Sequence, residues 1–181
     1  MKSKLIAPRH PIIRLEKPRL ELFPSYARLI SEMSTAGERI WEGMIPQPNE
    51  IPEAFVARLL EQEKTPGLNS VPATVYWATM EGEVVGRIQL RHELNEALKE
   101  FGGNVGYEVR PSFRRQGVAT EMLKQILATE RAKEMRRLLL TCAPDNIASN
   151  KTIASNGGLL VERKYVERIE RETCYYWIEI R

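Results

Sequence analysis

The sequence has few cysteines and histidines and no long hydrophobic run. Its two cysteines, Cys142 and Cys174, lie inside apolar stretches, which predicts buried free thiols and not a disulfide framework or a redox pair. The histidines, His10 and His92, are isolated, so we expect no metal site. No apolar run approaches the roughly 20 residues of a membrane-spanning helix, and the N-terminus lacks the apolar core of a secretory signal. These features predict a cytoplasmic protein without membrane association.

Charge of either sign is also not in large excess. The chain of 181 residues has 27 Lys and Arg against 24 Asp and Glu, a net charge of +3. A nucleic-acid-binding domain usually has a strong basic patch, often with interleaved aromatic residues, and neither is found here. We therefore expect no nucleic-acid partner. The length predicts one domain over 1–181, with 1–18 as an N-terminal arm.

The hydrophobic pattern predicts a mixture of strands and helices. Helices are expected over 24–36, 52–64 and 119–127, with another from Asn146 that Gly157 ends. Residues 74–92 have the pattern of a hairpin with Glu81 and Gly82 at its turn. The remaining strands are expected at 19–24, 104–110, 137–142, 159–161 and 173–180.

This order defines the expected architecture. The strand–helix–strand unit over 104–142 should be a right-handed parallel crossover, and antiparallel pairs should flank it. The predicted fold class is α/β, a mixed and mostly antiparallel sheet with a central β-α-β unit.

One strand-to-helix turn carries the clearest functional signal. Residues 110–124 read RPSFRRQGVATEMLK, in which Pro111 ends the strand and Gly117 lets a ligand approach the backbone closely. The free N–H groups of the following helix, with Arg114 and Arg115, favour an anion, and pyrophosphate suits them best. The stretch has neither the Walker pattern nor GxGxxG. From this turn alone, a solvated basic loop before an amphipathic helix explains the residues equally well.

The surrounding sequence resembles a known family. The stretch VGYEVRPSFRRQGVATEML resembles the acetyl-CoA-binding motif of the GNAT acyltransferase family, [Q/R]xxGx[G/A], which Arg114, Gly117 and Ala119 fill. About thirty residues further on, NIASNKTIASNGGLLVER is similar to the family's next segment, notably in the ribosomal-protein-type acetyltransferases. The resemblance covers 74–165 well, and it implies a GNAT-like fold over the whole chain.

The resemblance implies a cosubstrate, acetyl-CoA, and an amine acceptor on a small molecule, peptide or protein. The backbones of Tyr107 and Val109 would pair with the pantetheine arm, and an N–H there would polarise the thioester carbonyl. The backbone of the motif would wrap the pyrophosphate, through Arg114, Arg115, Gln116, Gly117, Val118 and Ala119. Homodimers are common in the family, so a homodimer is a further expectation.

Two polar residues after the motif have roles implied by the family. Asn146 matches the position that hydrogen-bonds pantetheine, although an Asn there can equally cap a helix. Many members have a tyrosine acid seven residues later, where this chain has Ile153. Ser149, three residues after Asn146, matches a second arrangement and is the candidate acid; a small residue packing helix against sheet is the alternative.

Glu108, on the strand before the motif, is the candidate general base. An ion pair with Arg87 or Arg91 across the sheet is the alternative. The run from Tyr175 to Trp177 could line an acceptor pocket or belong to a half-buried strand. The missing tyrosine leaves a second function open, an acyl-CoA-binding module without turnover. The sequence does not specify the acceptor.

Overall fold

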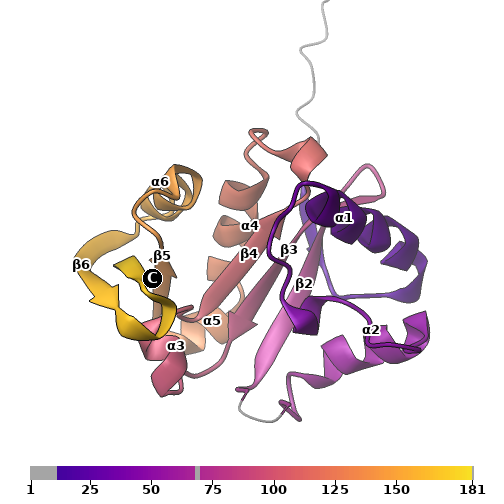
Figure 1. Cartoon of the computed structure of the whole chain (residues 1–181), viewed down its shortest axis with the longest axis horizontal. Helices are drawn as coiled ribbons and strands as arrows, with labels where there is room; N and C mark the ends of the chain where they lie inside the picture. Colours follow the sequence, from indigo (N-terminus) through magenta and orange to yellow (C-terminus); the bar gives the residue numbers. More distant parts are fainter. Residues whose placement is uncertain (1–11, 68–69, 181) are drawn as a thin grey trace, which may run out of the picture.

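A computed structural model describes residues 12–67 and 70–180 (Figure 1). The strands are β1 (Arg14–Glu16), β2 (Ala73–Met80), β3 (Glu83–Arg91), β4 (Val105–Val109), β5 (Arg137–Cys142), β6 (Leu159–Val166) and β7 (Arg171–Glu179). The helices are α1 (Phe23–Thr35), α2 (Pro52–Glu61), α3 (Glu96–Glu100), α4 (Val118–Leu127), α5 (Glu130–Met135) and α6 (Ile147–Ser155), with short 3-10 turns between them. In the described part, no helix is both long and apolar enough to cross a bilayer.

The strands form two sheets, in the orders β1-β2-β3-β4 and β5-β7-β6. Within each sheet, every pair of neighbouring strands is antiparallel. The predicted α/β class, mostly antiparallel, is therefore confirmed. The predicted hairpin is also present, with Glu81 and Gly82 between β2 and β3.

β4 and β5 are hydrogen-bonded through Asn104, just before β4, and Leu139, in the first half of β5. The Asn104 N–H donates to the Leu139 carbonyl (2.7 Å), and the Leu139 N–H donates to the Asn104 side chain (2.8 Å). Because the second bond goes to a side chain, the pairing of β4 with β5 does not continue as a backbone ladder. Gly103, with φ of 59°, is required here, since a Cβ would lie 2.3 Å from the Leu139 carbonyl oxygen. The predicted parallel pairing is thus limited to one backbone–backbone hydrogen bond, and among described residues the outer edge of β4 forms no ladder.

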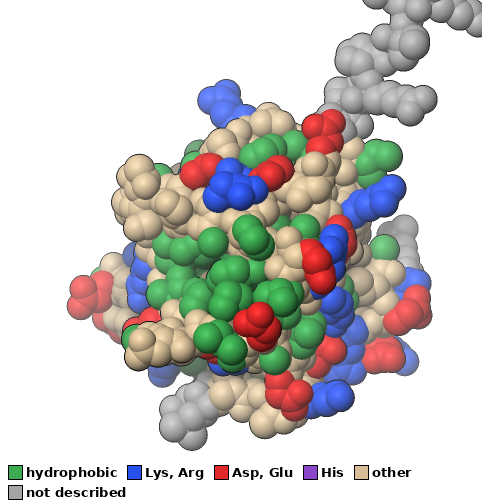
Figure 2. Space-filling view, turned by 90° about the vertical axis from the view of Figure 1, so that its right-hand side faces the viewer, with side chains coloured by type: hydrophobic (Ala, Val, Ile, Leu, Met, Phe, Trp, Pro, Cys, Tyr) green, Lys and Arg blue, Asp and Glu red, His purple; other side chains and the backbone are tan. Residues whose placement is uncertain are grey.

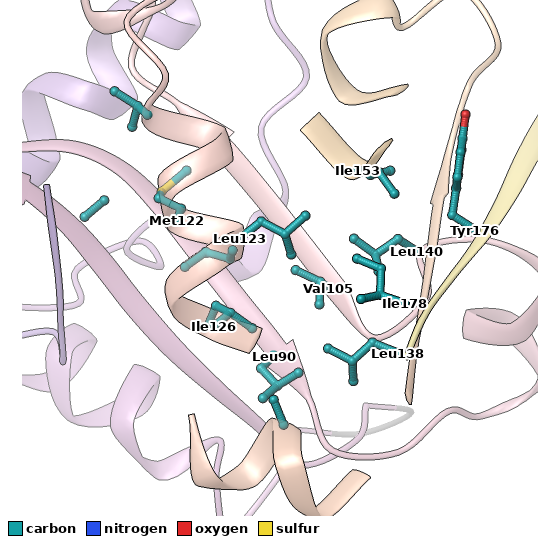
Figure 3. Close-up of a cluster of buried hydrophobic side chains, with 14 of the residues drawn as sticks. Leu90, Val105, Met122, Leu123, Ile126, Leu138, Leu140, Ile153, Tyr176 and Ile178 are labelled. Carbon is teal, nitrogen blue, oxygen red and sulfur yellow. The ribbon is translucent and has the colours of Figure 1, made fainter. Parts of the chain in front are cut away.

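One hydrophobic core, shared by the two sheets, packs them against each other. In Figure 3, Leu123 of α4 points toward side chains of β5 and β7, with Val105 between them. Met122 lies on the other side of α4, against Gly86 of β3. Leu123, Val105 and Met122 belong to one buried cluster, which also includes Ile153 of α6. This packing fixes β4, α4 and α6 relative to one another.

A second core lies on the opposite face of the first sheet. Tyr26 of α1 stacks on Trp77 of β2 with ring centroids 4.4 Å apart, and Phe55 of α2 packs beside Tyr26. Figure 2 shows the side of the molecule that carries α1 and α2, where hydrophobic side chains gather in the middle. Leu20, Ile51 and Leu60 are exposed residues of this region.

Two details of the prediction differ from the structure. Residues 19–24 form a 3-10 turn (Leu20–Leu22) and the start of α1, because Leu22, Tyr26, Leu29 and Met33 share one helical face. Part of the expected arm is strand β1, paired with β2; residues 1–11 lie outside the described part.

Candidate functional site

The outer edge of β4 presents free backbone groups. The Arg110 N–H donates to the Val85 carbonyl, and the Arg91 N–H donates to the Asn104 carbonyl. The backbone N–H and C=O groups of the even-numbered residues of β4 therefore point toward β3. Because these groups alternate between the two edges of a strand, the backbone groups of Tyr107 and Val109 point away from β3. Among the described residues, neither of their N–H groups has a hydrogen-bond partner. An extended chain could add to this edge as a further strand.

A second set of free N–H groups lies just after β4. The backbone N–H groups of residues 115–120 donate to no other group in the described part of the chain. Gly117, at the N-cap of α4, has φ of 79°, and its missing Cβ would face open space. Six free donors at the positive end of a helix dipole make a site for an anion.

The three arginines of this turn differ in their ion-pair partners. Arg110 is 8% exposed and binds Glu32 of α1 (2.7 Å) and Glu83 of β3 (3.1 Å). Arg114 pairs with Glu38 and also donates from Nε to the Val109 carbonyl (3.1 Å). These two residues anchor the turn to the end of α1. Arg115 is exposed and has no ion-pair partner among the described residues, so its charge is available.

The remaining motif residues complete the turn. Gln116 is exposed, and its side-chain amide donates to the Ser112 carbonyl (3.4 Å). Val118 is buried in the shared core, and Ala119 is half-buried. Val118 thus fixes the first turn of α4 against the sheet, while the backbone N–H groups around it stay open.

We expect the replacement of Arg110 by methionine to lower the free energy of unfolding by about 2 kcal/mol, because it removes a buried guanidinium that binds two partly exposed carboxylates. Arg28 offers the matched control, since it binds the same Glu83 (2.7 Å) with 51% of its side chain exposed. Arg28→Met should cost less than about 1 kcal/mol. Urea unfolding of both variants measures the difference, and equal losses would contradict a structural role for Arg110.

Asn146 and Ser149 lie at the start of α6. The Asn146 side chain accepts a hydrogen bond from the Ser149 N–H (3.0 Å), so it caps the helix. Its amide nitrogen has no hydrogen-bond partner in the described chain and remains available to a ligand. The Ser149 hydroxyl lies 2.8 Å from the Tyr107 hydroxyl. Ile153 is buried in the core, so packing occupies the position where many relatives have tyrosine.

Two further groups beside Ser149 keep their protons. Burial raises the pKa of Tyr107 to about 12, and burial raises the pKa of Cys142 to about 11. Cys142 and Cys174 are both free thiols, although they lie opposite each other on β5 and β7. The Tyr107 hydroxyl was not among the predicted catalytic groups, because the sequence does not show its contact with Ser149, 42 residues away.

Glu108 lies on the other face of β4 from Tyr107, since adjacent strand residues point to opposite faces. Its Oε2 atom is 3.6 Å from Arg87 Nε, so the cross-strand ion pair is present. Arg87 is 6% exposed and also donates to Gln89 (3.0 Å), whereas the Glu108 side chain is 21% exposed. Glu108 Oε2 is buried without a hydrogen bond. The ion pair with buried Arg87 therefore fixes the position of the Glu108 carboxylate.

Two aromatic residues outside the strands contact each other. Trp41, in the loop between α1 and α2, is exposed and contacts Phe101 with centroids 6.1 Å apart. Arg39 and Arg171 lie over these two rings. By contrast, Tyr175 and Tyr176 are buried and Trp177 is half-buried, as expected of a strand. No group of three His, Cys, Asp or Glu side chains in the described segments is placed to bind a metal.

The arrangement is that of an acyltransferase fold, with an open strand edge leading to a helix N-terminus. A family model for the acetyltransferase (GNAT) domain matches residues 13–158. The chain therefore belongs to the GNAT family and is an acetyl-CoA-dependent N-acetyltransferase.

Similar solved structures agree on the fold. One is the microcin C7 self-immunity acetyltransferase MccE in complex with acetyl-CoA and AMP, with 16% identity, a TM-score of 0.66, and coverage of 93% of this chain and 92% of that one. Another is Mycobacterium smegmatis RimJ with CoA-disulfide, with 18% identity, a TM-score of 0.66, and coverage of 92% and 81%. A third is the ribosomal-protein-S5-alanine acetyltransferase of Vibrio fischeri, with 16% identity, a TM-score of 0.65, and coverage of 97% and 96%. A search of curated proteins found no match.

Proposed function

We propose that this acetyltransferase holds acetyl-CoA along the open edge of β4 and transfers the acetyl group to a primary amine that approaches over Glu108. The observation that carries the proposal is two sets of free donors, the N–H groups of Tyr107 and Val109 at the strand edge and those of residues 115–120 at the start of α4. An extended pantetheine arm fits the strand edge, and a pyrophosphate fits the helix N-terminus.

Each predicted binding residue has a part in this arrangement. Arg115, Gln116, Gly117, Val118 and Ala119 supply backbone donors, and Arg115 adds a free positive charge. Arg114 positions the loop, because its side chain is bound to Glu38 and its N–H bonds the Pro111 carbonyl (3.3 Å). The free amide nitrogen of Asn146 would donate to the pantetheine arm while its oxygen caps α6.

The chemistry requires a polarised carbonyl, a deprotonated amine and a proton for the leaving sulfur. Acetyl-CoA supplies a thioester that an amine can attack. The outward N–H of Tyr107 or Val109 polarises its carbonyl, as in an oxyanion hole. Glu108, held by Arg87, accepts the amine's proton directly or through water.

Ser149 delivers a proton to the leaving sulfur and takes one from the Tyr107 hydroxyl bonded to it. Water then returns a proton to Tyr107, and Glu108 releases the amine's proton to water. Both hydroxyls lie on the opposite face of β4 from Glu108. The base and the acid therefore act from the two sides of the strand edge where the thioester would lie.

Removal of the Ser149 hydroxyl should lower kcat about tenfold, and Tyr107→Phe should lower it a few-fold, because CoA thiolate is a good leaving group and needs only modest help. The double variant should be no slower than Ser149→Ala alone, since both residues act on one proton path. Steady-state release of free thiol measures all three rates. Additive losses would contradict a shared path.

The acceptor is proposed to be a primary amine of a small molecule or of a peptide or protein. A panel of both kinds, assayed for free thiol and N-acetyl product, tests this. The alternative of a binding module without turnover draws on one observation, that Ile153 fills the family's tyrosine position. It predicts acetyl-CoA binding without thiol release from any amine.

A further inference from the structure

Two arginines lie over a pair of aromatic rings at the surface. Trp41, in the loop between α1 and α2, contacts Phe101, which directly follows α3. The Arg39 guanidinium lies 4.6 Å from the centre of the Trp41 ring, and the Arg171 guanidinium lies 5.7 Å from the centre of the Phe101 ring. These four residues, which we call the arginine–aromatic patch, bring together three segments that are distant in the chain.

Both arginines of the patch have a charge that is available to a ligand. Arg39 and Arg171 are exposed, and neither side chain forms an ion pair or a hydrogen bond with another described residue. Glu42, Glu170 and Glu172, exposed carboxylates close to them in the sequence, pair with neither arginine. A guanidinium that lies over a ring keeps the N–H groups at its edge free, and these groups match the two oxygens of a carboxylate. The patch therefore suits an acidic group of another molecule.

The patch lies on the face of the first sheet that carries Glu108. Glu108 is the cross-strand partner of Arg87 on β3, and Arg91, four residues further along β3, points to the same face. Arg91 donates to the carbonyls of residues 102–103 (3.1 and 3.0 Å), directly after Phe101. Arg91 therefore holds the turn that carries Phe101 on the face where the candidate base lies.

Gly106 leaves the surface between Glu108 and the patch without a side chain. It is two residues from Glu108 on β4, and a Cβ there would lie on the same face, 3.4 Å from Arg91 Nη2. Four residues, or roughly 13 Å at about 3.3 Å per residue, separate Glu108 from Asn104, where the turn with Phe101 joins β4. An extended peptide of about four residues spans this distance, and a small amino acid does not.

The other end of this face is closed. The turn after β4 is tied to the end of α1, because Arg110 binds Glu32 and Arg114 binds Glu38. A chain whose amine lies at Glu108 can therefore leave only toward the patch. This arrangement favours the N-terminal amine of a peptide over a lysine side chain, because the backbone on either side of a lysine would need room in both directions.

We propose that the acceptor is the N-terminal amine of an acidic peptide segment, whose carboxylates at about positions three to five bind Arg39 and Arg171. The inference rests on the function proposed above, and it adds the charge and the position of the residues that the enzyme recognises. The peptide lies over Gly106, between β4 and the loop that carries Trp41.

Steady-state release of thiol from acetyl-CoA with three peptides tests the proposal. The peptides have a free N-terminus and no lysine, and they differ only in having Glu, Gln or Arg at positions three to five. We expect kcat/KM to be about tenfold higher for the Glu peptide than for the Gln peptide, and lowest for the Arg peptide.

Charge reversal at the patch should invert this order. Arg39→Glu and Arg171→Glu should each lower kcat/KM for the Glu peptide about tenfold and raise it for the Arg peptide, because attraction becomes repulsion. Arg163→Glu is the matched control, since Arg163 is an exposed residue of β6 without an ion-pair partner in the described chain. It should leave all three values within about twofold. Thermal unfolding of each variant shows whether it is folded.

Three results would overturn this inference while the proposed function stands. One is equal kcat/KM for the three peptides, and another is turnover of small amines without turnover of any peptide. The third is a preference for the Glu peptide that the patch variants leave unchanged, or that Arg163→Glu reduces equally. Absence of thiol release with every amine and peptide would overturn the proposed function itself, and the inference with it.

Discussion

Replacement of Gly117 by glutamate is expected to weaken acetyl-CoA binding at least about a hundredfold. The carboxylate would lie at the first turn of α4, beside the free N–H groups of residues 115–120, where the site needs an anion of the ligand. A like charge in that position repels pyrophosphate and competes for the same donors. Isothermal titration with acetyl-CoA measures the change.

Gly117→Ala separates this charge effect from backbone strain. Gly117 has φ of 79°, so any other residue is strained there, at about 1 kcal/mol of stability. Its Cβ would nonetheless meet open space. The alanine variant should therefore unfold at a slightly lower temperature and bind acetyl-CoA within a few-fold of the original. Equal loss of binding in both variants would show that shape, and not charge, controls this turn.

Glu108→Gln is expected to lower kcat about a hundredfold, the effect of losing a general base. The amide keeps the size of the side chain but cannot accept a proton at neutral pH. Because Glu108 lies on the face of β4 opposite Ser149, affinity for acetyl-CoA should stay within a few-fold. Steady-state kinetics with the first acceptor found in the amine panel would measure both effects.

The pH profile distinguishes a base from a merely structural carboxylate. As pH rises toward the pKa of the acceptor amine, the amine loses its proton without help, so the deficit of Glu108→Gln should shrink. Removal of Glu108 also leaves buried Arg87 unpaired and should reduce stability, which thermal unfolding reports separately. A deficit that is constant across pH would assign Glu108 a structural role only.

Much of the fold followed from local patterns. The hairpin turn at Glu81 and Gly82, the face of α4 and the stop of α6 at Gly157 depend on residues close in sequence. The 19–24 segment was predicted wrongly because alternation over a few residues does not distinguish a strand from the first turn of a helix. The separation of β4 and β5 depends on the contact between Asn104 and Leu139, which no local pattern shows.

In the candidate site, too, the sequence predicted local features and missed contacts between residues far apart in the chain. The motif predicted the donors around Gly117, because turn geometry is local. It did not predict that Arg110 and Arg114 bind Glu32 and Glu38, since these partners lie more than seventy residues away in the chain. The Tyr107–Ser149 contact was missed for the same reason. Arginines crowded in sequence thus proved to have different partners in space.

The most direct test is to assay the unmodified chain with acetyl-CoA against small amines and N-terminal peptides, measuring free thiol and N-acetyl product together. The account predicts equal amounts of thiol and acetylated amine with at least one acceptor, and loss of both in Gly117→Glu. Acetyl-CoA binding without thiol release from any amine would contradict it and support a module that binds but does not turn over.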